Sequence, residues 1–384
     1  MKKIKSITFV VNDLNFFFSH RSNLIDLVEK NKQKIHIICP KHSSLKKNNY
    51  KHKITNFFIR QRGKNIFFEL FCFVDLLLKM LIVKSDLYHL ISFKPVLYGS
   101  MISKIFNKKV ICSFSGLGFF KRINKKEFFS KILIFIMIYS LKNNKNTYFI
   151  FQNTSDLKIL NSFLNFELNN NFVLVQGSGV EINYYYEIFN NKPSSNKKRF
   201  VYASRLIKEK GIMNFIEGAI KFNEKFCINK KDFEFLIVGK FINDELKWKI
   251  KKNFIRYIDH IDENIIYLDH QDSMKTIFEI ASVIVLPTYY GEGVPKVLIE
   301  SLASGVPIIT TFQRGCRELV NNGKNGFICR KKDSENLSLI FNQFSKLSKD
   351  ELNQMSQNCI SYAKDNLSID KVNEKHILAY KYFE

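Results

Sequence analysis

The sequence lacks several features that define common protein classes. Its seven cysteines are scattered singly without a CxxC pair, which argues against a disulfide framework or a zinc site and favours reduced thiols. No run approaches the ~18 uncharged apolar residues that a membrane span needs. The nearest run, ILIFIMIY at 132–139, is far too short. We therefore expect a chain that does not cross a membrane and works in a reducing compartment, the cytoplasm.

Acidic residues are scarce in the first half of the chain. Residues 1–175 hold 29 Lys and Arg but 9 Asp and Glu, whereas residues 176–384 hold 31 and 26. Such a basic surface attracts polyanions, either nucleic acid or the anionic leaflet of a membrane, where each basic residue contributes roughly 1 kcal/mol. Because no recognisable nucleic-acid-binding motif occurs, we favour an anionic membrane surface as the partner and expect no nucleic acid.

The length of 384 residues suits two domains, and both halves show the same alternation. Short β-branched or aromatic runs alternate with longer amphipathic stretches, which is typical of a parallel α/β sheet. Strands are expected at 6–11, 34–40, 86–92, 109–115, 147–153, 172–177, 200–205, 233–239, 264–270, 282–288, 306–311 and 325–329. Helices are expected in the first half at 20–31, 65–83, 96–106, 126–142 and 155–164. We predict an α/β protein with two Rossmann-like, doubly wound domains that face each other across a cleft and bind ligands at the carboxyl ends of their strands.

The expected domain boundary falls near residue 178. Residues 1–178 form the first domain and 179–369 the second, and a C-terminal helix at about 370–384 is expected to pack back on the first. The polar stretch 181–200, which contains Pro193, predicts a linker.

Two apolar stretches need interpretation. At the N-terminus, basic residues precede an apolar run, as in a signal peptide, but the run is interrupted at once by Asn12 and Asp13. We therefore expect a buried first strand there. The stretch 65–83 is very apolar and is interrupted by Glu69 and Asp75. It is either a buried packing helix or an interfacial helix that lies on lipid.

The second half holds a candidate phosphate site. In ASRLIKEKGI, Arg205 leaves the end of an expected strand and Lys210 precedes Gly211. A strand that ends in a glycine turn before a helix N-terminus is a place where phosphate binds, because backbone N–H groups and fixed cations neutralise it.

Two glutamates lie eight positions apart in YYGEGVPKVLIESLASG. Glu292 is expected in a glycine-rich loop after a strand, where a carboxylate and backbone N–H groups can hold sugar hydroxyls. Glu300 is expected about two turns into the following helix, at ~3.6 residues per turn. A turn residue and a surface helix residue are the structural alternatives. The combination with Arg205 and Lys210 favours a binding site.

These motifs resemble the retaining glycosyltransferases of family four (glycosyl transferases group 1), which have the GT-B fold. GEGVPKVLIE matches the E-x7-E signature of that family, and the resemblance continues through ASGVPIITT, GCRELV and NNGKNGF. Weaker similarities lie at 16–21, 90–99, 114–120 and 151–156, so that together they span most of the chain. The resemblance is strongest to members that build capsule, O-antigen, lipopolysaccharide or other glycan precursors on a polyprenyl diphosphate.

The resemblance implies a role for each residue of the donor site. Arg205 and Lys210 would hold the diphosphate of a UDP-sugar, Glu300 the ribose, and Glu292 the sugar near its transferring carbon. As catalytic residues it therefore implies Glu292, Arg205 and Lys210. The remaining donor-site residues that it implies are Gly177, His270, Gly293, Val294 and Pro295.

The acceptor side of the site is less well defined. Many family members carry a Gly-Gly loop after the first strand, whereas this chain has Asn12-Asp13-Leu14-Asn15. The acceptor-side candidates are His20, Arg21, His89, Lys94, Gly116 and Gly118, among which a lone histidine such as His89 is more often a core residue.

The resemblance also implies a mechanism. No Asp-x-Asp motif is present, so we expect no metal ion and no cofactor beyond the UDP-sugar substrate, with the leaving phosphate accepting the proton of the acceptor. The chain would then be a hexosyl- or N-acetylhexosaminyltransferase, bound peripherally to the inner face of the cell membrane, that acts on a lipid-linked saccharide. Two alternatives stay open: a UDP-sugar 2-epimerase with the same fold, and a non-enzymatic nucleic-acid binder.

Overall fold

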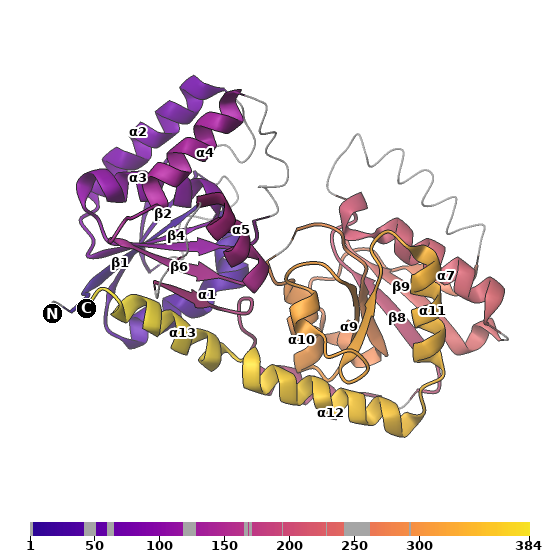
Figure 1. Cartoon of the computed structure of the whole chain (residues 1–384). Coiled ribbons are helices and arrows are strands. Elements are labelled where there is room, and N and C mark those ends of the chain that lie inside the picture. Colours follow the sequence, from indigo (N-terminus) through magenta and orange to yellow (C-terminus); the bar gives the residue numbers. More distant parts are fainter. Residues whose placement is uncertain are drawn as a thin grey trace. The chain divides into compact units, whose positions relative to one another are not determined.

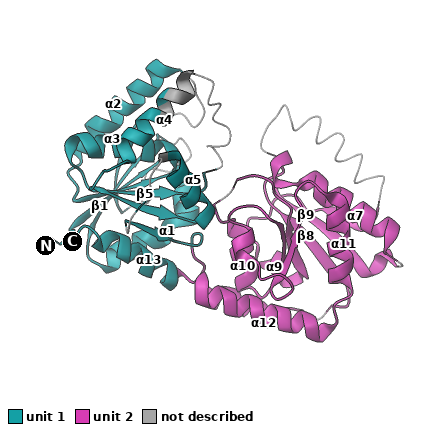
Figure 2. Ribbon diagram, in the orientation of Figure 1, with its two compact units in different colours: residues 1–178, 370–384 teal, residues 179–369 magenta. Residues whose placement is uncertain are grey.

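The computed structural model describes residues 3–41, 51–59, 65–117, 128–164, 168, 171–193, 195–227, 229–241, 262–291 and 293–384. The chain divides into two compact units (Figure 2). Unit 1 comprises Met1–Ser178 and Asp370–Glu384, and unit 2 comprises Gly179–Ile369.

The described residues of unit 1 form a sheet of seven parallel strands in the order β3-β2-β1-β4-β5-β6-β7. Helices lie on both sides of this sheet in Figure 1. The strands are β1 (Ser6–Val11), β2 (Lys34–Cys39), β3 (Lys53–Asn56), β4 (Leu87–Ile91), β5 (Val110–Phe114), β6 (Thr147–Phe151) and β7 (Phe172–Leu174). Of these, β3 is missing from the sequence-based expectation. Its residues, KITN, are too few and too polar to show a strand pattern.

Helices cover both faces of this sheet, because successive strand residues point to opposite sides. In β1, Val10 packs in one apolar cluster, whereas Phe9 and Val11 pack in the other. The first cluster is closed by α2 (Ile66–Ile82), α3 (Phe93–Phe106), α4 (Phe128–Leu141) and α5 (Thr154–Leu164). The second is closed by α1 (Leu14–Lys30) and by the C-terminal α13 (Ile369–Lys381), which packs on unit 1.

The described part of unit 2 contains a sheet of six parallel strands in the order β10-β9-β8-β11-β12-β13. The strands are β8 (Lys198–Ala203), β9 (Phe233–Val238), β10 (Ile265–Tyr267), β11 (Val283–Leu286), β12 (Ile308–Thr311) and β13 (Gly326–Cys329). The helices are α6 (Ile182–Asn190), α7 (Ile212–Lys225), α9 (Lys275–Ile280), α10 (Lys296–Ala303), α11 (Ser334–Ser345) and α12 (Lys349–Asn366). Both sheets are therefore parallel and doubly wound, which confirms the predicted fold class.

Two local predictions were wrong. The first helix begins at Leu14 and not at residue 20, because the side chain of Asp13 accepts a hydrogen bond from the N–H of Phe16 at 3.0 Å and caps it. The stretch 181–200 is not a free linker, since it forms α6 and the start of β8. In α6, Ile188 is 1% exposed and packs in the core of unit 2.

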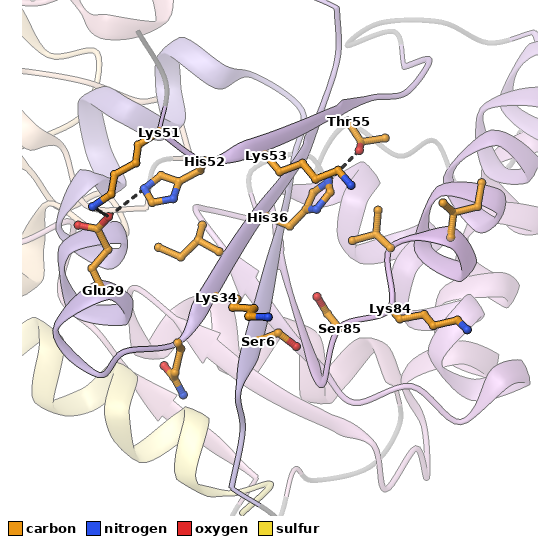
Figure 3. A pocket seen from close by; sticks show the side chains of 14 residues that line it. Ser6, Glu29, Lys34, His36, Lys51, His52, Lys53, Thr55, Lys84 and Ser85 are labelled. Carbon is orange, nitrogen blue, oxygen red and sulfur yellow. Dashed lines mark hydrogen bonds and ion pairs between the residues drawn. The ribbon is translucent and has the colours of Figure 1, made fainter.

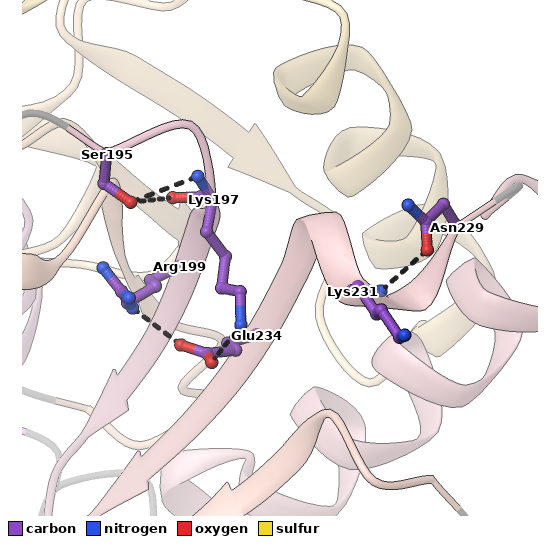
Figure 4. Close-up of polar contacts among 6 residues, drawn as sticks. All are labelled: Ser195, Lys197, Arg199, Asn229, Lys231 and Glu234. Carbon is purple, nitrogen blue, oxygen red and sulfur yellow. Dashed lines mark hydrogen bonds and ion pairs between the residues drawn. The ribbon is translucent and has the colours of Figure 1, made fainter.

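The amino ends of β8 and β9 are held in register by charge (Figure 4). Arg199 lies directly opposite Glu234, and its Nε donates to Glu234 Oε2 at 2.6 Å. Lys197 Nζ donates to Glu234 Oε1 at 2.7 Å. One carboxylate thus pairs with two cations at this edge.

Among the described residues, no helix combines the length and apolar character needed to span a bilayer.

Candidate functional site

The strand order of unit 2 reverses between β8 and β11. From β8 the chain passes to β9 and β10 on one side, then returns beside β8 as β11 and continues to β12 and β13. In open parallel sheets, ligands bind outside the carboxyl ends of the strands at such a reversal. The loops that leave β8 and β11 there contain residues 204–211 and 287–295, the two segments that carry the predicted donor site.

Backbone contacts hold these two loops together. The carbonyl of Glu209 accepts hydrogen bonds from the N–H groups of Tyr289 at 3.0 Å and Tyr290 at 3.2 Å. Gly211 has a φ of +81°, and a Cβ at that position would lie 2.2 Å from the carbonyl oxygen of Pro287. Only glycine permits both this backbone conformation and this close approach. The Arg205–Lys210 segment and the loop after β11 are therefore packed tightly against each other.

The two predicted phosphate ligands differ in exposure. Arg205 is exposed beyond the end of β8, whereas Lys210 is 6% exposed at the end of the short 3-10 helix η2 (Lys208–Lys210). After Gly211, α7 begins at once, so its N-terminal N–H groups follow Lys210 directly. An ammonium group beside the first turn of a helix is suited to binding phosphate.

Glu300 is held in place by unit 2 itself. It is 9% exposed on α10, and its Oε1 accepts a hydrogen bond from the Tyr185 hydroxyl at 2.7 Å and pairs with Lys296 Nζ at 3.3 Å. Burial and the carboxylate of Glu300 raise the pKa of Tyr185, so this hydroxyl stays protonated as a donor. Neither contact uses Oε2, which leaves that oxygen to accept from a ligand. Tyr185 lies on α6. The interpretation of this segment as a linker missed its role in holding Glu300.

The loop after β10 places His270 at the same edge of the sheet. His270 is exposed, and its backbone N–H donates to Asp269 Oδ1 at 2.7 Å. Tyr267 supports the turn, with its hydroxyl 3.0 Å from both Asp269 Oδ1 and the carbonyl of Gly239. Gly239, with a φ of +150°, passes so near the end of β8 that a Cβ would lie 1.8 Å from the carbonyl oxygen of Ser204. The ends of β8, β9 and β10 are therefore tied together.

The remaining donor-site candidates are less fully placed. Glu292 lies outside the described residues, and its role stays a prediction. Of the residues that follow, Gly293 and Pro295 are buried, while Val294 packs partly on the core of unit 2. Pro295 stands at the N-cap position of α10 with a φ of −65°. Gly177 belongs to unit 1, where it has a φ of +80°.

In unit 1 the corresponding reversal lies between β1 and β4. Directly after β4, Ser92 adopts a φ of +81° and a ψ of 165°, a conformation that a residue with a side chain rarely takes. After the neighbouring β5, Gly116 has a φ of 115°, and the buried Oγ of Ser115 has no hydrogen-bond partner among the described residues. Sequence reasoning identified Gly116 but missed Ser92 and Ser115, because neither strain nor an unsatisfied hydroxyl shows in a residue pattern. Gly118 lies beyond the described residues.

The other acceptor-side candidates are placed differently from one another. His20 is half-buried on α1, and its ring stacks on that of Phe16 with the ring centroids 4.2 Å apart. Arg21 is 2% exposed, its Nη1 is 3.5 Å from the carbonyl of Gly177, and burial lowers its pKa to about 10. Lys94 pairs with the buried Glu69 at 2.6 Å. Lys94 thus supports the fold in this structure, and no part of the described site depends on it.

His89 lies in the core of unit 1. It is 0% exposed, its Nε2 is 2.6 Å from Ser113 Oγ, and its Nδ1 is 3.1 Å from the hydroxyl of Tyr380 on α13. Burial, and then the charges of His376 and Arg21, lower the pKa of His89 well below its usual value, so the ring is neutral. A side chain so enclosed is a core residue, so the prediction of His89 as an acceptor contact does not fit the structure.

Comparison with known families identifies the chain. The model of glycosyl transferases group 1 matches residues 186–366, within unit 2, and that of glycosyl transferase 4-like proteins matches residues 6–153, within unit 1. The chain therefore belongs to the glycosyl transferases group 1 family.

Individual relatives share parts of the chain. The capsular polysaccharide biosynthesis glycosyltransferase CapM of Staphylococcus aureus is 29% identical over 151 residues, 39% of this chain and 36% of CapM. The UDP-Gal:alpha-D-GlcNAc-diphosphoundecaprenol alpha-1,3-galactosyltransferase of Escherichia coli is 27% identical over 183 residues, 46% of this chain and 45% of that enzyme. The chain thus spans less than half the length of these curated relatives. Among solved structures, Anabaena HepE in complex with UDP and glucose aligns with a TM-score of 0.76 at 14% identity, covering 99% of this chain and 100% of HepE. This last similarity shows the GT-B fold.

Proposed function

We propose that the chain transfers a hexose or an N-acetylhexosamine, with retention, from a UDP-sugar to a saccharide carried on a polyprenyl diphosphate. The product would enter a surface polysaccharide such as capsule or O-antigen, and the protein would work at the inner face of the cell membrane. The name of the E. coli relative, which contains a UDP-sugar and a diphosphoundecaprenol, supports this choice of donor and acceptor.

One observation carries the proposal. The segment with Arg205 and Lys210 is hydrogen-bonded through the carbonyl of Glu209 to the loop that precedes α10, at the reversal of strand order in unit 2. This arrangement supports a single pocket in which Lys210, Arg205 and helix N–H groups meet a diphosphate while Glu300 accepts from a ribose. A diphosphate and a diol in fixed relation are the two features shared by all UDP-sugars.

The proposed chemistry needs little from the protein beyond charge and position. The bond between the anomeric carbon and the phosphate oxygen breaks, an acceptor hydroxyl oxygen bonds to that carbon on the same face, and its proton goes to the departing phosphate. Arg205 and Lys210 neutralise the charge that develops on the leaving diphosphate. Glu292 positions the sugar.

Two neighbouring lysines allow a matched test of the phosphate assignment. Lys210→Met removes the buried ammonium, and Lys208→Met removes an exposed one from the same turn. A hydrogen bond to a charged group contributes about 1.5–3 kcal/mol, so we expect Lys210→Met to weaken UDP binding about 10- to 150-fold in calorimetry. Lys208→Met should bind UDP as the wild type does. Equal UDP affinity in both variants, with both folded by circular dichroism, contradicts the assignment.

A further inference from the structure

Helix α2 of unit 1 is apolar on two opposite faces. Its inner face packs on the sheet, with Cys72, Leu76 and Met80 at 0% exposure. On the opposite side, seven apolar residues are at least 36% exposed, and we call them the α2 outer face: Phe67, Leu70, Phe71, Val74, Leu78, Leu81 and Ile82. At 100° per residue these seven fall within an arc of about 120°. A helix that is apolar all round is ordinarily covered on all sides. Among the described residues, Phe58 packs against Phe71 with ring centroids 5.2 Å apart, and all seven side chains still remain at least 36% exposed.

The acidic residues of α2 do not lie on the outer face. Glu69 points inward, where it is 9% exposed and binds Lys94 at 2.6 Å. The carboxylate of Asp75 accepts a hydrogen bond from the N–H of Phe58 at 2.8 Å and lies 3.6 Å from Lys79. The two acidic residues of this stretch are therefore engaged beside or beneath the helix. A surface of this kind marks a place where the protein meets an apolar partner.

A basic pocket of about 820 Å³ adjoins the C-terminal end of α2 (Figure 3). Ile82 ends the outer face and also lines this pocket, together with Val83 and Lys84. From the amino ends of the neighbouring strands, the pocket receives the side chains of Lys34, His36, Lys51, His52 and Lys53.

The positive charge of the pocket is not balanced. Its single carboxylate, Glu29, pairs with Lys51 at 3.2 Å and His52 at 3.3 Å. Within the described residues, Lys34, Lys53 and Lys84 have no carboxylate within ion-pair distance. In unit 2, by comparison, Glu234 binds two cations at the amino edge of the sheet, Lys197 and Arg199 (Figure 4). Lys34, Lys53 and Lys84 of unit 1 adjoin the exposed face of α2.

We propose that unit 1 docks on an anionic lipid bilayer, with the α2 outer face among the acyl chains and Lys34, Lys53 and Lys84 against lipid phosphates. The apolar stripe, the lysines at its end and the excess of basic residues in 1–175 fit one occupant, a surface that is apolar within and negatively charged outside. A second copy of this chain fits less well because two such basic units repel each other. The docking surface deepens the membrane location in the proposed function, but it lies on unit 1 alone and does not depend on which sugar or acceptor the enzyme uses.

Vesicle sedimentation of the full chain tests the proposal. The probes are vesicles of equimolar phosphatidylcholine and phosphatidylglycerol, and vesicles of phosphatidylcholine alone. The wild type should bind the anionic vesicles, and less so in high salt. In Leu70→Glu/Leu78→Glu the partition coefficient should fall by at least about tenfold for each leucine. In Lys34→Gln/Lys84→Gln it should fall by roughly fivefold for each lysine on anionic vesicles and remain unchanged on neutral ones.

Leu378→Glu provides the matched control. Leu378 lies on α13 of the same unit and is 59% exposed, as is Leu70. Its variant should bind vesicles as the wild type does. If the double glutamate variant is unstable, Phe67→Ser, at an 81% exposed position, replaces it. The proposal is overturned if the wild type does not bind anionic vesicles, or if the outer-face variants bind as well as the control. It is also overturned if the wild type self-associates without lipid and these variants are monomeric, because a second copy then covers the face.

Discussion

Gly211→Ala should disrupt the proposed donor site through the backbone alone. At a φ of +81°, a residue with a Cβ costs about 1–2 kcal/mol in backbone strain. The new Cβ would also lie 2.2 Å from the carbonyl oxygen of Pro287, against a normal closest distance of 3.0 Å. The two loops must therefore move apart by roughly 0.8 Å, which weakens the hydrogen bonds to Glu209, each contributing about 0.5–1.5 kcal/mol. We expect a total loss of about 3 kcal/mol in unfolding free energy. Because a displacement of about 1 Å at a reacting centre reduces the rate about 100-fold, we expect a similar fall in kcat.

Gly323→Ala separates strain from collision. Gly323 has a φ of +78°, but no atom lies within 4 Å of a Cβ built there. This control should lose only the strain of about 1–2 kcal/mol and keep the UDP affinity and kcat of the wild type. The measurements are urea unfolding, calorimetry with UDP and release of UDP during turnover. If Gly211→Ala behaves like Gly323→Ala in all three, the close packing of the two loops does not support the site.

Two further predictions concern the stability of unit 1. Glu69→Ala leaves the ammonium of Lys94, with 16% of its side chain exposed, without its carboxylate, and we expect a loss of about 3 kcal/mol in urea unfolding; a loss below about 0.5 kcal/mol would refute the structural role of the pair. Burial lowers the pKa of His376 to about 3 and that of His89 well below 6.5, with the cation Arg21 adding to both shifts. The unfolded chain therefore binds these protons first, and stability should fall as the pH drops from about 6.5 towards 3, by up to about 1.4 kcal/mol per pH unit for each ring. His376→Gln should flatten this profile of unfolding midpoint against pH, and an unchanged slope would contradict the assignment.

The sheets were predictable because parallel strands buried on both faces appear as short apolar runs. The first strand begins and ends at the predicted residues, Ser6 and Val11, and the strand at Thr147–Phe151 lies wholly within its predicted range. The strand at Lys53–Asn56 could not be recognised in the sequence, because it is only partly buried and its sequence is polar. Patterns of this kind report how much of a side chain is buried, and they fail where little is buried.

The site was only partly predictable, for a different physical reason. Arg205, Lys210 and Glu300 stand out because they interrupt a local pattern of strand, turn and helix. Tyr185, which fixes the carboxylate of Glu300, lies 115 positions away in a segment that reads as a polar linker. Similarly, nothing around His89 in the sequence shows that α13 closes over it. Contacts between distant segments depend on the topology, and a residue pattern does not contain them.

The first loop of unit 1 affects where the donor diphosphate can bind. A Gly-Gly loop at this position, without a side chain to cap the helix, would leave the first backbone N–H groups free for phosphate. In this chain Asp13 caps α1, and its carboxylate accepts the N–H of Phe16 that a phosphate would otherwise bind. The same carboxylate adds negative charge at a helix N-terminus, where it competes with an anionic ligand for the dipole. We therefore expect the contacts to the donor diphosphate to come mainly from Arg205, Lys210 and the start of α7. In the proposed function, unit 1 would then serve the acceptor, and in the proposed docking its α2 would contact the membrane.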